Sequence, residues 1–281
     1  MAITNFQQII WSKKIQKSLD TLTSLKNHCD FQYERDSKNA KEVKILGVVR
    51  PTIRTYVPGT ALTREAGTDS SQTLKLNQYR YFDFEIEDID KAQSVPGLIE
   101  ALTQEATAGL SDEGDKYVAG IVADEAAKES PEISVLTPVQ LSTLTDGGVA
   151  NIEAAFAKLY NKNCKVSDKF YLEINADWYT ILRPEIIELD TNNSDLIKQG
   201  FVGKYGNAMI SIENLLAKKT IQTKASTVCM LRTSKAVAFC GQIDKLEAYR
   251  PHDSFQDALK GLYVFGAKIV RPEQICAIPV Y

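Results

Sequence analysis

Histidine is scarce in this sequence, and its scarcity argues against several kinds of catalytic chemistry. Of 281 residues only His28 and His252 are histidine. No Cys-x-x-Cys or His-x-x-x-His spacing is present, so the chain lacks the common ligand patterns of zinc sites. The five cysteines are odd in number and scattered. That pattern is typical of reduced cysteines in a cytoplasmic protein and argues against a disulfide framework.

Long apolar runs are also missing. No stretch of eighteen consecutive apolar residues exists, so no membrane-spanning helix is expected. The N-terminal residues mix lysines with spaced apolar residues and lack the continuous apolar segment of a signal peptide. With 44% hydrophobic and 25% charged residues, the composition is that of an average soluble globular protein, which excludes a largely disordered chain.

Motifs for nucleophilic catalysis and nucleotide binding are absent as well. There is no Gly-x-Ser-x-Gly, and the run Gly200–Lys204 is too short for a phosphate loop. The acidic run Glu85–Asp90 could bind Ca²⁺, but it lacks the EF-hand glycine and terminal glutamate, so a solvated strand end is favoured. His28 and Cys29 are adjacent on a predicted helix end, where their side chains do not face each other as a catalytic pair.

Charge is present in near balance but is unevenly placed. The net charge of the chain is −3. Residues 1–56 hold ten basic and five acidic residues, a balance of +5, so the remaining residues carry −8. A basic leading segment on an acidic body suggests a tail that meets an anionic partner. A solvated helix followed by a polar linker explains the same charges equally well.

The first part of the chain predicts a helix, a linker and a long hairpin. Apolar residues recur at helical spacing over residues 4–27, and residues 27–42 are polar. Residues 43–56 and 73–86 have strand patterns, and the glycine-rich and serine-rich residues 57–72 form the tip between them. The second strand pattern has apolar residues at Leu74 and Leu76, then at Tyr79 and Tyr81, and at Phe82, Phe84 and Ile86 after a phase slip. Its aromatic residues could stack on nucleic acid, but the alternating acidic residues favour a hairpin arm.

The rest of the chain predicts one very long helix and several strands. Helical spacing extends from Pro96-Gly97 to Ser130-Pro131, and its glycines suggest a helix that lies along a sheet with close contacts at those positions. Residues 131–216 predict a compact α/β unit with a short helix that stops before Pro184 and a hairpin that turns at Gly206-Asn207. Four extended runs follow.

The order of these parts, together with local sequence, resembles the major capsid (coat) proteins of tailed double-stranded DNA bacteriophages, the Hong Kong ninety-seven fold. Residues Tyr81–Gln93 are similar to the family's hairpin return into the long helix. Residues Gly200–Ile210 resemble its glycine-punctuated turn, and Ser211–Leu215 resemble the ending of that motif. Residues Ala248–Arg250 and Phe255–Glu273 resemble its C-terminal strands. The resemblance covers nearly the whole chain.

The resemblance implies an α+β fold with five parts. Residues 1–42 would form an N-terminal arm, and residues 43–86 an extended β-hairpin loop. Residues 87–132 would be the peripheral domain with its long spine helix, and residues 133–221 the axial domain. Residues 222–281 would supply further peripheral strands and the C-terminal return strand.

The resemblance also implies a function. The chain would be a structural subunit, not an enzyme, that self-assembles into hexamers and pentamers of an icosahedral capsid around double-stranded DNA. It would need no cofactor or metal, would meet portal and scaffolding proteins but no membrane, and would be assembled in the host cytoplasm and found in the virion. The residues implied in inter-subunit contacts are Arg54, Tyr56, Arg64, Tyr79 and Tyr81. The lysines implied to face DNA, by charge contacts without sequence reading, are Lys13, Lys14 and Lys17.

Two other hypotheses stay open at this stage. The related fold of bacterial nanocompartments encloses cargo proteins, so a cargo-enclosing shell protein is the main alternative. A soluble enzyme with an unrecognised site is the second. Electron microscopy distinguishes the three, because it would reveal shells with DNA, shells with protein cargo, or no shells.

Overall fold

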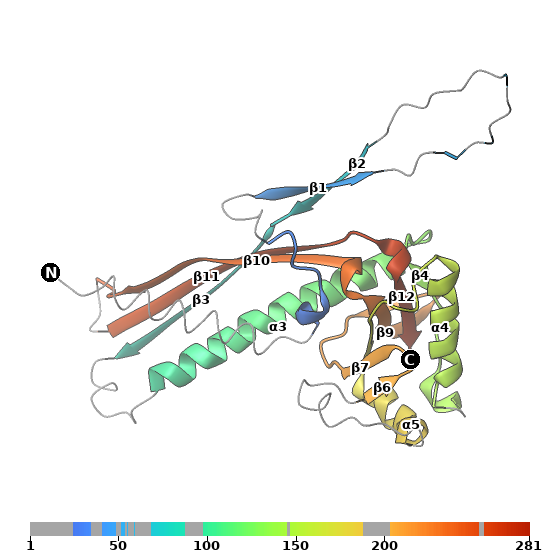
Figure 1. Cartoon of the computed structure of the whole chain (residues 1–281). Helices are drawn as coiled ribbons and strands as arrows, with labels where there is room; N and C mark the ends of the chain where they lie inside the picture. Colours follow the sequence, from blue (N-terminus) through green and yellow to red (C-terminus); the bar gives the residue numbers. More distant parts are fainter. Residues whose placement is uncertain are drawn as a thin grey trace.

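The computed structural model describes residues 25–34, 41–48, 52–53, 55, 59, 69–87, 98–144, 147–187, 203–252 and 256–281. Within these ranges the chain has three parts (Figure 1). They are a compact body, an elongated layer of three strands and one long helix, and a β-hairpin that packs on the elongated layer. The expected α+β class is confirmed. No helix in the described ranges is long and apolar enough to cross a membrane.

The compact body is built on a seven-stranded mixed sheet with the order β4-β12-β9-β5-β7-β6, in which β8 pairs with β9. Helix α4 is amphipathic, and its apolar residues pack on the sheet through a T-shaped contact of Phe156 with Phe170. The elements of the body are β4 (Ser134–Val135), α4 (Val149–Asn161), β5 (Phe170–Ile174), α5 (Ala176–Ile187), β6 (Gly203–Tyr205), β7 (Ala208–Ile212), β8 (Lys218–Ile221), β9 (Lys224–Thr233) and β12 (Ile275–Val280).

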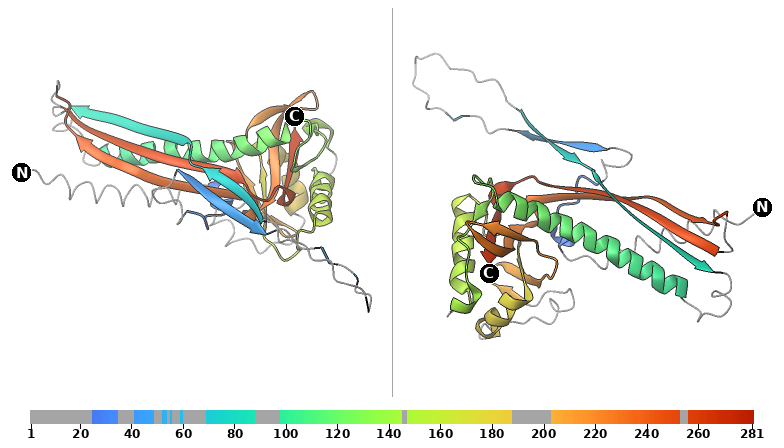
Figure 2. Two further views of the ribbon diagram at one scale, coloured as in Figure 1. Left: turned by 90° about the horizontal axis from the view of Figure 1, so that it is seen from above. Right: turned by 180° about the vertical axis from the view of Figure 1, so that it is seen from behind.

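The elongated layer is an antiparallel three-stranded sheet with helix α3 along one face (Figure 2). Its elements are β3 (Gln78–Glu87), α3 (Leu98–Ala126), β10 (Val237–Tyr249) and β11 (Gln256–Ile269), with β11 in the centre. Aromatic residues fill the space between helix and sheet: Tyr117 of α3 meets Phe265 edge-on, and Phe265 stacks on Phe239 and Tyr263. The predicted helix between residues 97 and 130 is confirmed.

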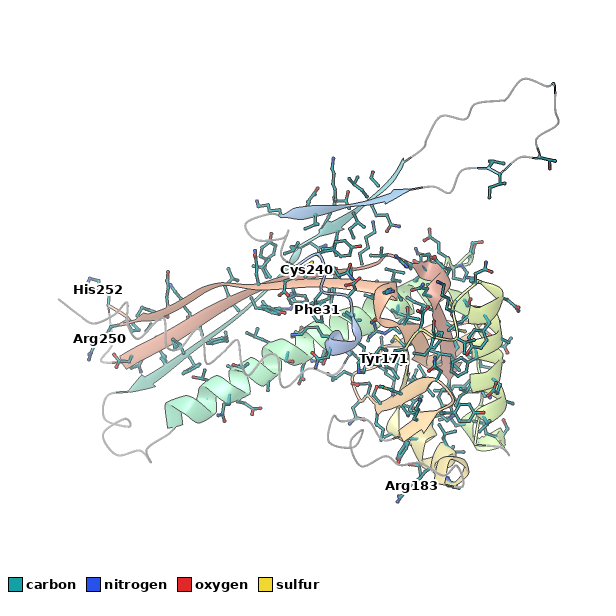
Figure 3. The ribbon with its side chains drawn as sticks, viewed as in Figure 1. Phe31, Tyr171, Arg183, Cys240, Arg250 and His252 are labelled. Atoms are coloured by element: carbon teal, nitrogen blue, oxygen red, sulfur yellow. The ribbon has the colours of Figure 1, made fainter. Side chains whose placement is uncertain are left out.

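The hairpin consists of β1 (Glu42–Val48) and β2 (Asp69–Lys75), paired antiparallel. Its apolar face rests on the sheet face opposite α3, where Ala238, Cys240 and Val264 form a second, smaller core with Val43, Ile45 and Leu74 of the hairpin and with Leu76, which follows β2. Figure 3 shows Cys240 at this meeting point, where β10 passes below the hairpin. A two-stranded hairpin is marginal alone, so this small core stabilises β1 and β2 against the elongated layer.

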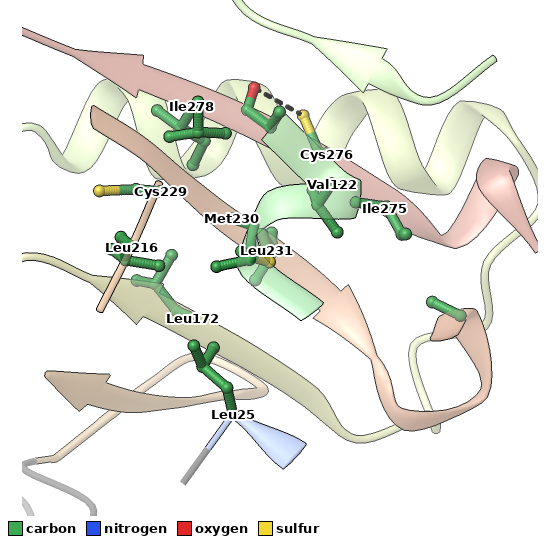
Figure 4. Close-up of a cluster of buried hydrophobic side chains, with 14 of the residues drawn as sticks. Leu25, Val122, Leu172, Leu216, Cys229, Met230, Leu231, Ile275, Cys276 and Ile278 are labelled. Carbon is green, nitrogen blue, oxygen red and sulfur yellow. Dashed lines mark hydrogen bonds between the residues drawn. The ribbon is translucent and has the colours of Figure 1, made fainter. Parts of the chain in front are cut away.

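The main core lies in the body, around β9 and β12 (Figure 4). Met230, Leu231 and Ile278 are fully buried there, and Leu25 reaches into the same core from the N-terminal segment. Short 3-10 helices complete the described chain: η1 (Lys26–His28), η2 (Leu141–Thr143), η3 (Ser234–Ala236) and η4 (Pro272–Gln274). The predicted hairpin at residues 203–212 is confirmed, with Gly206 at a positive φ of 55° in its turn.

The predicted second hairpin arm, residues 73–86, is divided between two sheets. Its first part, β2, pairs with β1, whereas β3 pairs with β11. The change of strand partner falls at Leu76 and Asn77, where the apolar alternation in the sequence changes phase. The prediction of a single long hairpin was therefore wrong, because each half of this arm buries its apolar side chains against a different surface.

Two local predictions were also wrong. Helix α5 does not stop before Pro184 but continues to Ile187. The fully buried Trp178 and Leu182 anchor this helix, and Pro184 is exposed, so tertiary packing outweighs the loss of one backbone hydrogen bond. Close approaches were expected at the glycines of α3, but only Gly114 lies near another element, with space for a Cβ 3.6 Å from the Phe239 ring. Gly109 and Gly120 face open space.

The C-terminal strands are shared between the two sheets. Strands β10 and β11 lie in the elongated layer. Strands β9 and β12 are central strands of the body and pair with each other, and β9 also pairs with β5. The chain therefore leaves the body after β9 and returns to it at β12.

Candidate assembly site

The described residues contain no cluster that would mark a metal site. No group of three or more His, Cys, Asp or Glu residues lies together in this part of the chain. Of the acidic run that could bind Ca²⁺, residues 88–90 lie outside the described ranges. All five cysteines are buried and free. Burial raises the pKa of the Cys229 and Cys276 thiols to about 12, so neither is a thiolate at neutral pH.

Only two of the predicted contact residues can be located. Tyr79 and Tyr81 lie on β3, with 54% and 78% of their surface exposed. Arg54, Tyr56 and Arg64, predicted for inter-subunit contacts, lie outside the described residues. So do Lys13, Lys14 and Lys17, the predicted DNA-facing lysines.

The two tyrosines share one face of the three-stranded sheet. Tyr81 is the partner of Leu262 and Tyr79 is the partner of Val264 in the antiparallel register, so these pairs point to the same side. Leu262 and Val264 belong to the small core beneath the hairpin. The tyrosines therefore extend that apolar surface beyond the hairpin, on the face that α3 does not cover. We call this surface the outer sheet face.

Polar contacts fix β3 in this position. On the α3 side, Arg80 Nε donates to Glu113 Oε2 at 3.1 Å. On the outer sheet face, the Tyr249 hydroxyl donates to Asp83 Oδ2 at 2.9 Å, and Lys260 Nζ lies 4.8 Å from the centre of the Tyr249 ring. These contacts keep both tyrosines on a rigid sheet, where their rings could be buried by a partner at little conformational cost.

The hairpin presents a second exposed apolar residue. Leu46 of β1 points away from the small core and is 74% exposed. Its neighbours Val43 and Ile45 are buried, as expected for alternation along a strand. Leu46 therefore leaves apolar surface exposed on the hairpin, which is a feature of chains that bind another copy or another protein.

A buried ion pair joins the body to the N-terminal segment, and this group was missed from the sequence. Glu173 of β5 and Arg232 of β9 are both fully buried, and their side chains meet in a bidentate pair with N–O distances of 2.7 and 2.9 Å. His28 Nδ1 lies 2.8 Å from Glu173 Oε1, and its ring stacks on Tyr171. A charged residue inside each of two apolar strands was the sequence signal.

The ion pair determines the protonation of its neighbours. Burial alone would raise the pKa of the Glu173 carboxyl, but the charge of Arg232 and hydrogen bonds from His28 and Arg232 hold the pKa below its ordinary value. Burial raises the pKa of the Cys29 thiol, although Arg232 opposes that effect. His28 and Cys29 therefore serve a structural contact here, with the glutamate charged and the thiol neutral.

This ion pair predicts a loss of stability in acid. A carboxyl with a lowered pKa stabilises the folded state above its unfolded pKa of about 4.3, and that contribution disappears as the pH falls through the folded value. We expect the urea concentration at the midpoint of unfolding to decrease as the pH is lowered below about 4. We expect Glu173→Gln to weaken this dependence of the midpoint on pH. The partly exposed Glu113 and Glu125 also have lowered pKa values. Measurement in high salt screens these surface groups but not Glu173, and an unchanged acid slope in Glu173→Gln would contradict the assignment.

Comparison with known proteins gives structural matches only. No family model and no curated protein sequence matches the chain. A solved structure from Mycobacterium phage Che8 matches with a TM-score of 0.71 and 27% identity, covering 91% of this chain and 90% of that one. The capsid structure of cyanophage P-SCSP1u matches with a TM-score of 0.67 and 17% identity, covering 86% and 84%. A virus-like particle from Pyrococcus furiosus matches with a TM-score of 0.57 and 12% identity, covering 97% and 99%. The last two likenesses concern the fold alone.

Proposed function

We propose that this chain, a phage major capsid protein with the Hong Kong ninety-seven fold, self-assembles into the hexamers and pentamers of an icosahedral shell that encloses double-stranded DNA. The observation that carries the proposal is the likeness to the Che8 structure, which spans nearly the whole chain at 27% identity. The capsid of a second phage shares the same fold. The subunit acts as a building block in the virion and has no catalytic role.

The exposed apolar residues support the self-assembly part of the proposal. Tyr81 on the outer sheet face and Leu46 on the hairpin would each lose apolar surface to water-excluding contacts in a shell. Arg54, Tyr56 and Arg64 lie between β1 and β2 in the sequence, so the hairpin would bring them to a neighbouring subunit. Tyr79 and Tyr81 would receive a neighbour on the outer sheet face.

Charge supports the contact with DNA. Residues 1–56 carry +5, and Lys13, Lys14 and Lys17 lie in that part of the sequence. Lysines that neutralise phosphates bind DNA without reading its sequence, and such binding weakens steeply with salt. The proposed N-terminal arm would reach packaged DNA or adjacent subunits. Portal and scaffolding proteins would be further partners, and assembly would take place in the host cytoplasm.

Shortening the hairpin tests the proposal directly. Because β2 begins at Asp69, a deletion of residues 57–68 removes the distal loop and leaves both strands intact. We expect the purified variant to unfold in urea at the same midpoint as the parent chain but to form no closed shells. Negative-stain electron microscopy and sedimentation measure the outcome. Replacement of residues 57–68 by glycine and serine at equal length separates the loss of side chains from the loss of length, and closed shells of normal size from the deletion would refute the role of the loop.

The nanocompartment alternative makes a different prediction for the contents of the shell. The fold likeness to a virus-like particle from Pyrococcus furiosus keeps this hypothesis open, with a lower TM-score than the phage match. Shells isolated from the native source would hold nuclease-protected double-stranded DNA under the capsid proposal and protein cargo under the alternative. A chain that remains monomeric under all assembly conditions would contradict both.

A further inference from the structure

Residues 25–31 bridge the compact body and the elongated layer. Lys26 N donates to Asp115 Oδ1 of α3 at 2.8 Å. Asp30 forms a parallel bridge with β10, in which its N–H donates to Val237 O and its carbonyl accepts from Phe239 N. Phe31 meets the Phe239 ring edge-on. Figure 3 labels Phe31 and Tyr171 in the region where the elongated layer joins the body.

The Arg232 guanidinium is the central donor in this arrangement. Its Nε and Nη2 groups donate hydrogen bonds to the Glu173 carboxylate. The same guanidinium donates to Leu25 O at 2.8 Å and to His28 O at 3.2 Å, and Nη1 lies 3.4 Å from Cys29 Sγ. A planar five-donor group suits this task, because it binds a carboxylate in a fork and still reaches backbone carbonyls. Glu173 therefore orients Arg232 toward the segment.

We propose that Glu173 and Arg232 form an intramolecular binding site for a peptide segment, namely residues 25–30 of the chain itself, and that this segment docks and opens as a unit separately from the rest of the fold. The ligand is a short turn of peptide that presents two backbone carbonyls and an imidazole. The site fixes the position of Leu25, the first described residue of the chain. Its consequence for the proposed N-terminal arm depends on the proposed function, whereas the docking does not.

The chemistry distinguishes a binding site from a purely stabilising ion pair. Replacement of a buried ion pair by apolar residues of similar volume is often neutral or favourable for folding. The double variant Glu173→Leu/Arg232→Met should therefore keep the sheet folded. It cannot donate to Leu25 O and His28 O, so the segment loses the side-chain hydrogen bonds that tie it to the body, whereas the hydrogen bond from His28 N to Leu25 O lies within the segment and remains. The double variant should keep the fold and lose the docking of the segment.

Cysteine alkylation measures docking and folding in one experiment on the full chain. Cys29 lies in the segment, whereas Cys229, Cys240 and Cys276 are fully buried in the two sheets and report on the fold. In the double variant, we expect iodoacetamide to label Cys29 at least tenfold faster than in the parent chain, with Cys229, Cys240 and Cys276 still protected. Arg232 lowers the pKa of the Cys29 thiol, so its loss alone would slow the reaction. Faster labelling of Cys29 in the double variant therefore reports greater exposure of its thiol to solvent.

Proteolysis gives an independent readout. Lys26 is buried in the docked segment, so trypsin should not cut after it in the parent chain and should cut there in the double variant. The matched control is Asp124→Asn, which removes the exposed ion pair of Asp124 with Lys219 between α3 and β8. The control should leave both Cys29 labelling and cleavage at Lys26 unchanged.

The outcomes separate docking from global unfolding. Protection of Cys29 and Lys26 equal to the parent chain in a folded double variant would overturn the proposal. If the double variant does not fold, the parent chain in increasing urea decides the question. Labelling of Cys29 at lower urea than Cys229 supports separate docking, and simultaneous labelling of all cysteines overturns it. None of these measurements requires shell assembly, so failure here is distinguishable from failure of the capsid proposal.

Discussion

Replacement of Gly266 by alanine should prevent the hairpin base from seating on the elongated layer. A Cβ at position 266 would lie 2.1 Å from Lys75 O, 2.9 Å from the Lys75 carbonyl carbon and 3.0 Å from Leu76 Cα. All three are backbone atoms, so no side-chain rotation relieves the overlap. We expect Gly266→Ala to lower the free energy of unfolding by about 3 kcal/mol and to abolish shell formation. Urea denaturation and electron microscopy measure the two effects.

The matched control is a glycine with open surroundings. Gly109 of α3 has no neighbouring atom within 4 Å of an added Cβ, so Gly109→Ala should be neutral or stabilise the helix by up to about 1 kcal/mol. If Gly266→Ala and the parent chain were equally stable, the backbone of Lys75 and Leu76 would not lie against β11 at Gly266.

Removal of one partner from the buried ion pair should have the second large effect. Arg232→Met leaves Glu173 charged in a fully buried position, and broken buried pairs typically lower stability by about 3–5 kcal/mol. The loss should shrink in acid, because protonation of Glu173 then relieves the unpaired charge. The midpoint of urea unfolding as a function of pH measures both quantities.

A double-mutant cycle completes this prediction. The Glu173→Leu/Arg232→Met variant should recover most of the stability lost in Arg232→Met, because neither charge remains buried. A loss below about 1 kcal/mol in the single variant, or an equal loss in the double variant, would contradict the assignment of a tightly coupled pair.

Regular periodicity determined which elements could be predicted. Helix α3 and the hairpin at Gly206 were found because helical spacing and turn residues act locally. The separation of β2 from β3 could not be found, since the phase change after Leu76 shows that a strand alters its face but not which strand becomes its new partner. The extension of α5 through Pro184 depended on the burial of Trp178 and Leu182, which a local signal does not contain.

The residues of the candidate site also divide into those that a local pattern predicts and those that depend on tertiary contacts. Tyr79 and Tyr81 could be selected from alternation along β3 and from the family resemblance. The contact of Arg232 with Glu173 and His28 joins residues that are far apart in the sequence, so no local pattern predicts it. Only the occurrence of charged residues within the apolar strands Phe170–Ile174 and Lys224–Thr233 marked these positions as unusual.

The two-residue junction at Leu76 and Asn77 also has a geometric consequence. Strands β2 and β3 are consecutive in the chain but belong to different sheets, so a small change of backbone dihedral angles at these residues rotates the hairpin relative to the elongated layer. Such a rotation would separate Val43, Ile45 and Leu74 from the β10 and β11 residues of the small core. The small core therefore sets the angle at which the two sheets cross, and a substitution that weakens it would change the direction of the hairpin strands and not only their stability.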